Sequence, residues 1–170
     1  MVKFQTKILA ELIAAVALAG ALHLITLFQL PQGGRVTAAA MVPILVVALR
    51  RGPRVGVLAG VAYGLVVLVE EPFIFHPIQV LLDYSVAFGA LGLAGFFRRI
   101  SLVGVAVGIA GRFVAHFISG IVFFATYAPE GMNPALYSAI YNGSYLVPEF
   151  LVSSIVLFIL QRRRILEIYL

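Results

Sequence analysis

A cation, an imidazole, a glycine and an aromatic ring follow one another at four-residue intervals in an apolar stretch. They are Arg112, His116, Gly120 and Phe124, within Gly111–Tyr127. Residues four apart lie on one face of a helix, and ionisable groups at membrane depth usually face a bundle interior or a water-filled cavity. This combination is typical of the wall of a binding site.

The composition places this stretch in a membrane protein. Of the 170 residues, 62% are hydrophobic and 11% are charged, which is unusual for a soluble domain. Cysteine is absent, which excludes a disulfide frame, a thiolate metal site and a catalytic thiol. The net charge of +5 falls in short clusters between apolar runs. Such clusters indicate membrane topology rather than a surface for nucleic acid.

Six apolar runs are long enough, or nearly so, to cross a membrane. We therefore expect an all-α integral membrane protein, a compact bundle of six transmembrane helices in a single domain over residues 1–170. The first run lacks a clear cleavage site and is interpreted as a spanning helix rather than a signal peptide. The expected helices cover residues 6–30, 36–49, 55–69, 77–97, 101–127 and 135–160.

Charged residues between these runs predict the orientation of the bundle. One set of connections and both terminal segments are basic, namely Lys3 and Lys7, Arg50 to Arg54, Arg98 and Arg99, and Arg162 to Arg164. The intervening connections carry Arg35 but otherwise Glu70, Glu71 and Glu130. By the positive-inside rule, both termini are expected to be cytoplasmic.

Most of the polar and aromatic side chains of the last three helices converge on the outer half of the membrane in this orientation, with His116 near its middle and Arg112 one turn deeper. They are Asp83 and Tyr84, then Arg112, His116, Gly120 and Phe124, then Tyr137 and Asn142. A carboxylate accepts hydrogen bonds from amino groups of a heterocycle, and His, Asn and Arg orient polar atoms. Aromatic faces attract organic cations. We expect an outward-facing pocket for a small, flat, partly cationic nutrient, with the loop at Pro31–Arg35 as a candidate lid.

Some of these residues also have a structural interpretation. Asp83 could neutralise Arg112, because a paired buried charge costs far less than an unpaired one. His116 could be a hydrogen-bonded histidine of the bundle interior. The sequence leaves both interpretations open.

Polar residues outside this set have simpler interpretations. Tyr141 fits the aromatic belt at a membrane interface. Glu11 and Glu149 fit structural pairs or partner contacts, and His23 has no companion that the sequence identifies. None of them is assigned to the ligand.

The sequence does not favour an enzyme. Ser119 follows His116 by three residues, but no oxyanion-hole motif accompanies them. The histidines lack the spacing of metal ligands, and no phosphate-binding loop of the GxxxxGK[S/T] type occurs. We expect no catalytic residue, metal or cofactor, and any step driven by ATP requires another chain.

Four segments resemble the thiamine-specific substrate-binding (S) components of energy-coupling factor (ECF) transporters, the ThiT/YuaJ-like family. They are LPQGGRVTAAAMVPILVVALRRGP, HPIQVLLDYSVAFGALGLAGFF, HFISGIVFFATYAPEGMNP and LYSAIYNGSYLVPE. The resemblance implies a high-affinity thiamine (vitamin B1) binding subunit in a prokaryotic cell membrane. It also implies an ABC-type importer in which this subunit docks with a transmembrane coupling subunit and two cytoplasmic ATPases.

The resemblance further implies a role for each candidate site residue. Asp83 would bind the aminopyrimidine, and the thiazolium would lie between Tyr84, His116 and Phe124. Hydrogen bonds would come from Tyr137 and Asn142. Arg112 would lie at the deep end of the site, and Gly120 would form part of its wall. Some family members carry Glu, Lys and Trp where this chain has Asp83, Arg112 and Phe124, which bears on the preference among thiamine analogues.

A family docking motif of small residues is matched loosely in the first helix. We assign Ala14, Ala15 and Ala17 to the surface that meets the coupling subunit.

Two other functions stay open on the sequence. One is an S-component for a related pyrimidine, a thiazole or a thiamine phosphate. The other is a stand-alone carrier that uses Asp83, Glu149 and His116 as a proton relay.

Overall fold

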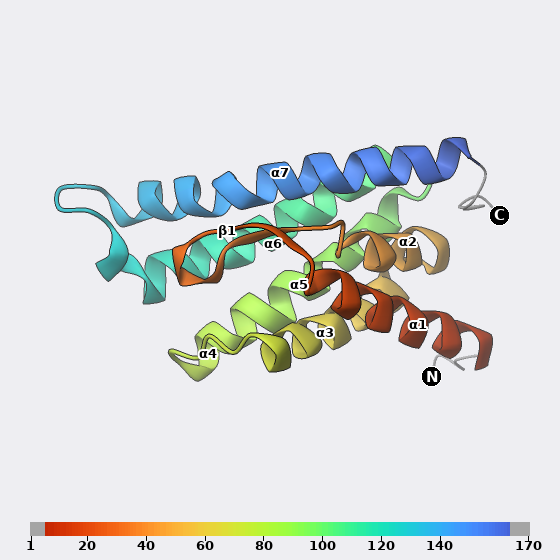
Figure 1. Ribbon diagram of the computed structural model, residues 1–170, viewed down its shortest axis with the longest axis horizontal. Helices are drawn as coiled ribbons and strands as arrows, with labels where there is room; N and C mark the ends of the chain where they lie inside the picture. Colours follow the sequence, from red (N-terminus) through yellow and green to blue (C-terminus); the bar gives the residue numbers. More distant parts are fainter. Residues whose placement is uncertain (1–5, 164–170) are drawn as a thin grey trace.

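The computed structural model describes residues 6–163, and Figure 1 shows them as a bundle of helices along one long axis. The helices and strands are α1 (Thr6–His23), β1 (Thr26–Gln29), η1 (Pro31–Gly33), β2 (Arg35–Thr37), α2 (Val42–Arg51), α3 (Pro53–Glu70), α4 (Pro77–Val80), η2 (Leu81–Val86), α5 (Ala87–Gly89), η3 (Ala90–Phe97), α6 (Ser101–Phe123), η4 (Ala125–Tyr127) and α7 (Pro134–Arg162). Lys3 and Arg164, two members of the terminal basic clusters, lie outside the described residues.

Within residues 6–163, five helices are long and apolar enough to cross a membrane. They are Thr6–His23, Pro53–Glu70, Pro77–Phe97, Ser101–Phe123 and Pro134–Arg162. The mostly helical membrane fold expected from the sequence is therefore confirmed, and the chain is a multi-pass membrane protein. The third of these helices, Pro77–Phe97, consists of α4, the π-helical segment η2, α5 and the 3₁₀ segment η3.

The expected boundaries of the first two helices are wrong. The first helix ends at His23 rather than at residue 30, and the second begins at Val42 rather than at residue 36. The intervening chain forms an antiparallel β-hairpin of β1 and β2. Because α2 has only ten residues and so spans about 15 Å, it is too short to cross a membrane alone.

The strands of the hairpin contain β-branched and aromatic residues, and Pro31–Gly33 forms the turn between them. Its register pairs Thr26 with Thr37 and Gln29 with Arg35. Positive φ angles at Gln32 (62°) and Gly33 (88°) close the turn, as hairpin turns with two left-handed residues require. In Figure 1 the hairpin runs between α7 and the helices α3 and α4.

The predicted end of the fifth helix, residue 127, also differs, whereas the remaining boundaries agree within two residues. α6 stops at Phe123, and a short 3₁₀ turn, η4, covers part of the remainder of the predicted 101–127 run. The helix expected over 77–97 begins and ends as predicted.

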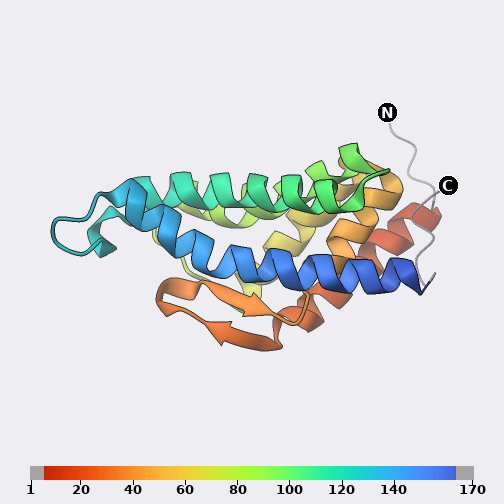
Figure 2. The ribbon, with the colours of Figure 1, turned by 90° about the horizontal axis from the view of Figure 1, so that it is seen from above.

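The basic clusters lie together in space. Figures 1 and 2 show the beginning of α1, the α2–α3 junction, the beginning of α6 and the end of α7 at one end of the bundle. Arg98 there donates hydrogen bonds to the backbone carbonyls of Leu49 and Arg50. The α3–α4 and α6–α7 connections lie at the opposite end. This arrangement agrees with the alternation of charge, whereas the assignment of the basic end to the cytoplasm stays a prediction.

Glycines bring the Pro77–Phe97 helix into backbone contact with α3. A Cβ atom on Gly60 would overlap the carbonyl of Phe88, and one on Gly64 would overlap the carbonyl of Tyr84. Gly60 and Gly64 are therefore packing residues, because close helix approach requires small residues. They also fix the backbone that carries Asp83.

Gly64→Ala should therefore lower the free energy of unfolding by about 1–3 kcal/mol, as overpacking does. The matched control is Gly143→Ala in α7, where an added Cβ meets no atom within 4 Å. Thermal unfolding of the detergent-solubilised protein measures both changes. A transition midpoint that is the same for Gly64→Ala and for the control would contradict the packing role.

Candidate ligand-binding site

A cavity of about 430 Å³ opens between the hairpin, the end of α3, the Pro77–Phe97 helix, α6 and α7. Its volume lies within the range of small-molecule sites, about 300–1,000 Å³. All eight residues predicted to bind the ligand line it, namely Asp83, Tyr84, Arg112, His116, Gly120, Phe124, Tyr137 and Asn142. The structure thus brings the whole predicted set together, while the role of each member in binding stays a prediction.

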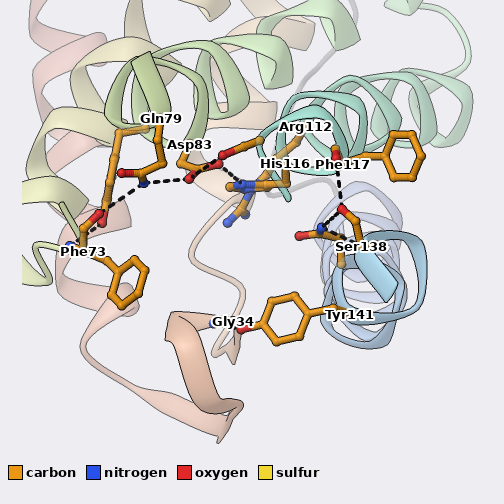
Figure 3. Close-up of polar contacts among 12 residues, drawn as sticks. Gly34, Phe73, Gln79, Asp83, Arg112, His116, Phe117, Ser138 and Tyr141 are labelled. Atoms are coloured by element: carbon orange, nitrogen blue, oxygen red, sulfur yellow. Dashed lines mark hydrogen bonds and ion pairs between the residues drawn. The ribbon is translucent and has the colours of Figure 1, made fainter. Parts of the chain in front are cut away.

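Asp83 is held by three hydrogen bonds from neighbouring side chains. Its Oδ2 accepts from Gln79 Nε2 at 2.7 Å and from Ser119 Oγ at 3.0 Å, and its Oδ1 lies 3.0 Å from His116 Nδ1. Figure 3 shows these contacts as part of a chain from Gln79 to Arg112. Asp83 belongs to η2, and π-helical turns are frequent at functional sites.

His116 lies between Asp83 and Arg112 and is fixed by both. Arg112 Nε donates to His116 Nε2 at 3.2 Å. A guanidinium has only donors, so Nε2 must be unprotonated and the ring proton resides on Nδ1, which donates to Asp83. The imidazole is therefore neutral, with one orientation and one tautomer.

Arg112 does not pair directly with Asp83, so that structural interpretation is wrong in its simple form. Its side chain is 8% exposed, Nη1 donates to Met41 Sδ at 2.9 Å, and Cζ lies 4.2 Å from the centre of the Phe88 ring. None of the ion pairs among residues 6–163 includes Arg112. The cation is stabilised by a ring face and by His116, and it reaches the carboxylate only through that imidazole.

Tyr84 can offer its ring to a ligand but not its hydroxyl. The hydroxyl donates to the carbonyl of Glu71 and accepts from the amide of Phe73, each at 2.9 Å. These bonds hold the connection after α3 against the Pro77–Phe97 helix.

Asn142 finds most of its hydrogen-bond partners inside α7. Its Nδ2 donates to Ser138 O at 2.9 Å and to Ser138 Oγ at 3.2 Å, and its Oδ1 accepts from the Tyr145 hydroxyl at 2.8 Å. An amide oxygen has two acceptor sites, so one remains for another donor.

Gly120 and Phe124 line the cavity and also contact neighbouring segments of the chain. A Cβ on Gly120 would overlap Ser138 Oγ, so the absence of a side chain at Gly120 lets Ser138 of α7 pack against α6. The Phe124 ring contacts Phe73 with centroids 5.8 Å apart and Tyr127 with centroids 6.0 Å apart.

Sequence reasoning missed part of the α7 wall. Tyr137, Tyr141 and Tyr145 are spaced by four and all line the cavity, with adjacent ring centroids 6.0 and 5.9 Å apart. The assignment of Tyr141 to an interfacial belt is therefore wrong. The four-residue spacing was the signal that could have found both Tyr141 and Tyr145.

Two residues of α7, Tyr141 and Glu149, anchor the hairpin by hydrogen bonds. The Gly34 amide donates to the Tyr141 hydroxyl at 2.9 Å, and that hydroxyl donates to the carbonyl of Pro31. Further along, the Thr37 amide and hydroxyl donate to Glu149 Oε1 at 2.6 and 2.7 Å. Glu149 is thus structural, as one of its interpretations had it.

Glu149 does not extend a relay from the cavity. Among the described residues, no hydrogen bond or ion pair joins Glu149 to Asp83 or His116. Glu11, the other carboxylate with a structural interpretation, forms two hydrogen bonds with Arg51 at 2.7 and 2.5 Å.

On the side away from α7, an ion pair binds the hairpin to the connection after α3. Arg35 forms an ion pair with Glu71, and His23 Nε2 lies 3.8 Å from the same carboxylate. His23 Nδ1 is also 3.1 Å from the Tyr63 hydroxyl. His23 therefore has two companions that the sequence did not identify, because both are distant along the chain.

The predicted docking residues of α1 do not share one environment. Ala14 and Ala17 are exposed, whereas Ala15 is half-buried and packs against the hydrophobic core. Only the first two are fully available to a partner.

Residues 9–168 match a family model described as "Thiamine transporter protein (Thia_YuaJ)". The chain belongs to this thiamine transporter family. The family resemblance drawn from the sequence motifs is therefore confirmed. Its relatives are named as transporters, and the chain is not an enzyme.

Two curated relatives and one solved structure support the membership in the Thia_YuaJ family. The chain is 39% identical to thiamine transporter ThiT of Bacillus subtilis (strain 168) over 149 residues, which cover 78% of this chain and 77% of the relative. It is 32% identical to ThiT of Lacticaseibacillus paracasei over 123 residues, or 61% of each chain. A solved structure of ThiT from Listeria monocytogenes superposes with a TM-score of 0.84 at 26% identity, covering 92% of this chain and 94% of that one.

Tyr141→Phe tests the anchoring of the hairpin on α7. Loss of the hydroxyl leaves the Gly34 amide without its acceptor, so its hydrogen exchange should accelerate about fivefold, the equivalent of ~1 kcal/mol. Exchange is measured by NMR in detergent micelles without ligand. Tyr127→Phe is the control, because Tyr127 lines the same cavity and its hydroxyl makes no hydrogen bond within residues 6–163. Unchanged exchange at Gly34 in Tyr141→Phe would contradict the anchor.

Proposed function

We propose that this chain binds thiamine in the described cavity and acts as the substrate-binding component of an ECF-type importer. The observation that carries the proposal is the carboxylate of Asp83, which faces a cavity lined by aromatic rings. Thiamine joins an aminopyrimidine to a thiazolium cation, so it offers an amino donor and a flat cation to these groups. The relatives named as thiamine transporters support the same ligand.

Asp83 is the acceptor for the aminopyrimidine in this proposal. The faces of Tyr84, His116 and Phe124 flank the thiazolium, since ring quadrupoles attract cations. The neutral state of His116 suits this position, because an imidazolium would repel the cationic ring. A phenylalanine face attracts a cation less strongly than tryptophan does, so Phe124 makes this contact weaker than in relatives with Trp.

The remaining predicted residues supply polar contacts around the ligand. Asn142 Oδ1 retains one acceptor site, and Tyr137 lies at the cavity wall beside Tyr141. Arg112 can donate to an acceptor on the ligand, because its charge is not paired with a carboxylate among the described residues. Gly120 contributes a wall without a side chain.

Energy for uptake would come from other chains. The sequence contains no phosphate-binding loop, so a coupling subunit and two ATPases would supply the driving force. We further propose that the basic end of the bundle is cytoplasmic, with both termini on that side. The cavity then opens outward, where it can capture the vitamin.

Calorimetric titration of the purified chain with thiamine, thiamine monophosphate and pyridoxine tests the ligand. We expect tight binding of thiamine, weaker binding of its phosphate and no binding of pyridoxine. The same protein in sealed vesicles should not accumulate thiamine without its partners. Accumulation driven by a proton gradient in the isolated chain would contradict the S-component and favour the stand-alone carrier.

Asp83→Asn should weaken thiamine binding about tenfold to a hundredfold, because a hydrogen bond to a charged group contributes about 1.5–3 kcal/mol. The ligand-free protein should also lose some stability, because the new NH2 group cannot accept from one of the donors on Asp83, but this loss should be smaller than the loss of binding free energy. Glu11→Gln is the control, since it alters a carboxylate paired with Arg51 away from the cavity. Equal losses of affinity and of stability in Asp83→Asn would indicate a structural carboxylate instead.

Leucine at Ala14 or Ala17 should spare thiamine binding and impair assembly with the coupling subunit. Both alanines are exposed on α1, and a larger side chain there prevents close helix approach. Co-purification with the coupling subunit and ATPases measures assembly, with Ala106→Leu on the exposed face of α6 as the control. Normal assembly of both α1 variants would remove this surface from the interface.

A further inference from the structure

Gln79 is a buried polar residue that the family-based assignment does not include. It lies in α4, four residues before Asp83, and is 1% exposed. We propose that Gln79 is a positioning residue that leaves Asp83 a single acceptor site, directed at the amino group of the ligand. This inference rests on the proposed function, because it refines how the same site selects its ligand.

The orientation of the Gln79 amide is fixed by the backbone around it. Its Oε1 accepts from the amides of Phe75 at 3.0 Å and His76 at 3.5 Å, and its Nε2 donates to the carbonyl of Phe73 at 3.1 Å. A flipped amide would set its oxygen against the Phe73 carbonyl and its NH₂ group against two N–H donors. The network therefore assigns Nε2 to the side that faces Asp83.

Nε2 also donates to Asp83 Oδ2, at 2.7 Å. Gln79 thus joins the connection that carries Phe73, a ring of the cavity wall, to the carboxylate of the site (Figure 3). With two donations and two acceptances, its amide has no capacity left for a ligand. Gln79 acts on binding through Asp83 and not by contact.

The hydrogen bonds of Asp83 then determine what it can accept. An ionised carboxylate has about four acceptor sites, two on each oxygen. Gln79 and Ser119 occupy both sites on Oδ2, and His116 occupies one on Oδ1. One site on Oδ1 remains, so Asp83 receives a single N–H from the ligand.

This arrangement favours a heterocycle with an exocyclic amino group over one that lacks it. A ligand without that donor leaves the last site on Oδ1 unpaired in a desolvated pocket, and such groups are costly. Without the Gln79 donor, the carboxylate can rotate and its Oδ2 also becomes available, so the direction of the remaining acceptor is no longer fixed. Gln79 therefore contributes selectivity as well as affinity.

The test compares two ligands in matched variants. Gln79→Met keeps the length of the side chain and removes its polar atoms, and Ser119→Ala removes the other Oδ2 donor without touching the Phe73–His76 backbone. Both are titrated with thiamine and with a thiamine analogue whose exocyclic amino group is replaced by hydrogen. We expect Gln79→Met to bind thiamine about tenfold more weakly and the analogue within twofold of the unaltered chain.

Ser119→Ala should show the same selective loss with a smaller magnitude, and it decides the test if Gln79→Met does not fold. In an Asp83→Asn background, Gln79→Met should add little to the loss, because both changes remove one function. Equal losses for the two ligands, or additive losses with Asp83→Asn, would show that Gln79 only stabilises the fold. If the unaltered chain binds no thiamine, the proposed function fails as well; if it binds thiamine and the losses are unselective, only this inference fails.

Discussion

The structure depends on keeping a carboxylate in an apolar bundle by surrounding it with donors. Asp83 receives hydrogen bonds from Gln79 on its own helix and from His116 and Ser119 on α6. An unpaired carboxylate in such a place would be costly, whereas three donors hold it in a single arrangement. These bonds join the Pro77–Phe97 helix to α6, and His116 in turn accepts from Arg112. The glycine contacts with α3 then hold the Asp83 backbone in place.

The hairpin shows the same constraint applied to the backbone. Non-helical chain at membrane depth is tolerated only where protein or a water-filled cavity satisfies its polar groups. Here the Thr37 amide is bonded by Glu149, and the Gly34 amide and Pro31 carbonyl are bonded by Tyr141. Arg35 and Glu71 secure the other side. The hairpin can therefore form one wall of a binding cavity, because α7 satisfies polar groups of its turn and of β2.

Much of this arrangement could be predicted from sequence, because charge clusters and apolar runs are local signals. The helix over 77–97 could be predicted from the boundaries of its apolar run. The convergence of eight residues from three helices could be predicted from those boundaries together with the alternation of basic and acidic connections along the chain. Residues 24–30 could not be assigned correctly, since a short apolar run fits a helix or a strand equally well. They form a strand by pairing with Arg35–Thr37, and the chain from Pro31 to Thr37 is held in turn by Tyr141 and Glu149 of α7, more than a hundred residues away.

The role of Gln79 was hidden for a different reason. A glutamine at the beginning of a helix is usually read as part of a cap, and its bonds to the Phe75 and His76 amides have that character. Its contact with Asp83 follows from the four-residue spacing, but its importance depends on donors from α6. The partners of His23 were hidden in the same way, because Tyr63 lies forty residues later in the chain.

The most direct test of the account is an experimental structure of the chain with thiamine bound. The account predicts the vitamin in the cavity beneath the hairpin, with its exocyclic amino group at hydrogen-bond distance from Asp83 Oδ1. The thiazolium should lie against the rings of Tyr84, His116 and Phe124. Thiamine bound outside this cavity, or inside it with the amino group directed away from Asp83, would contradict the account.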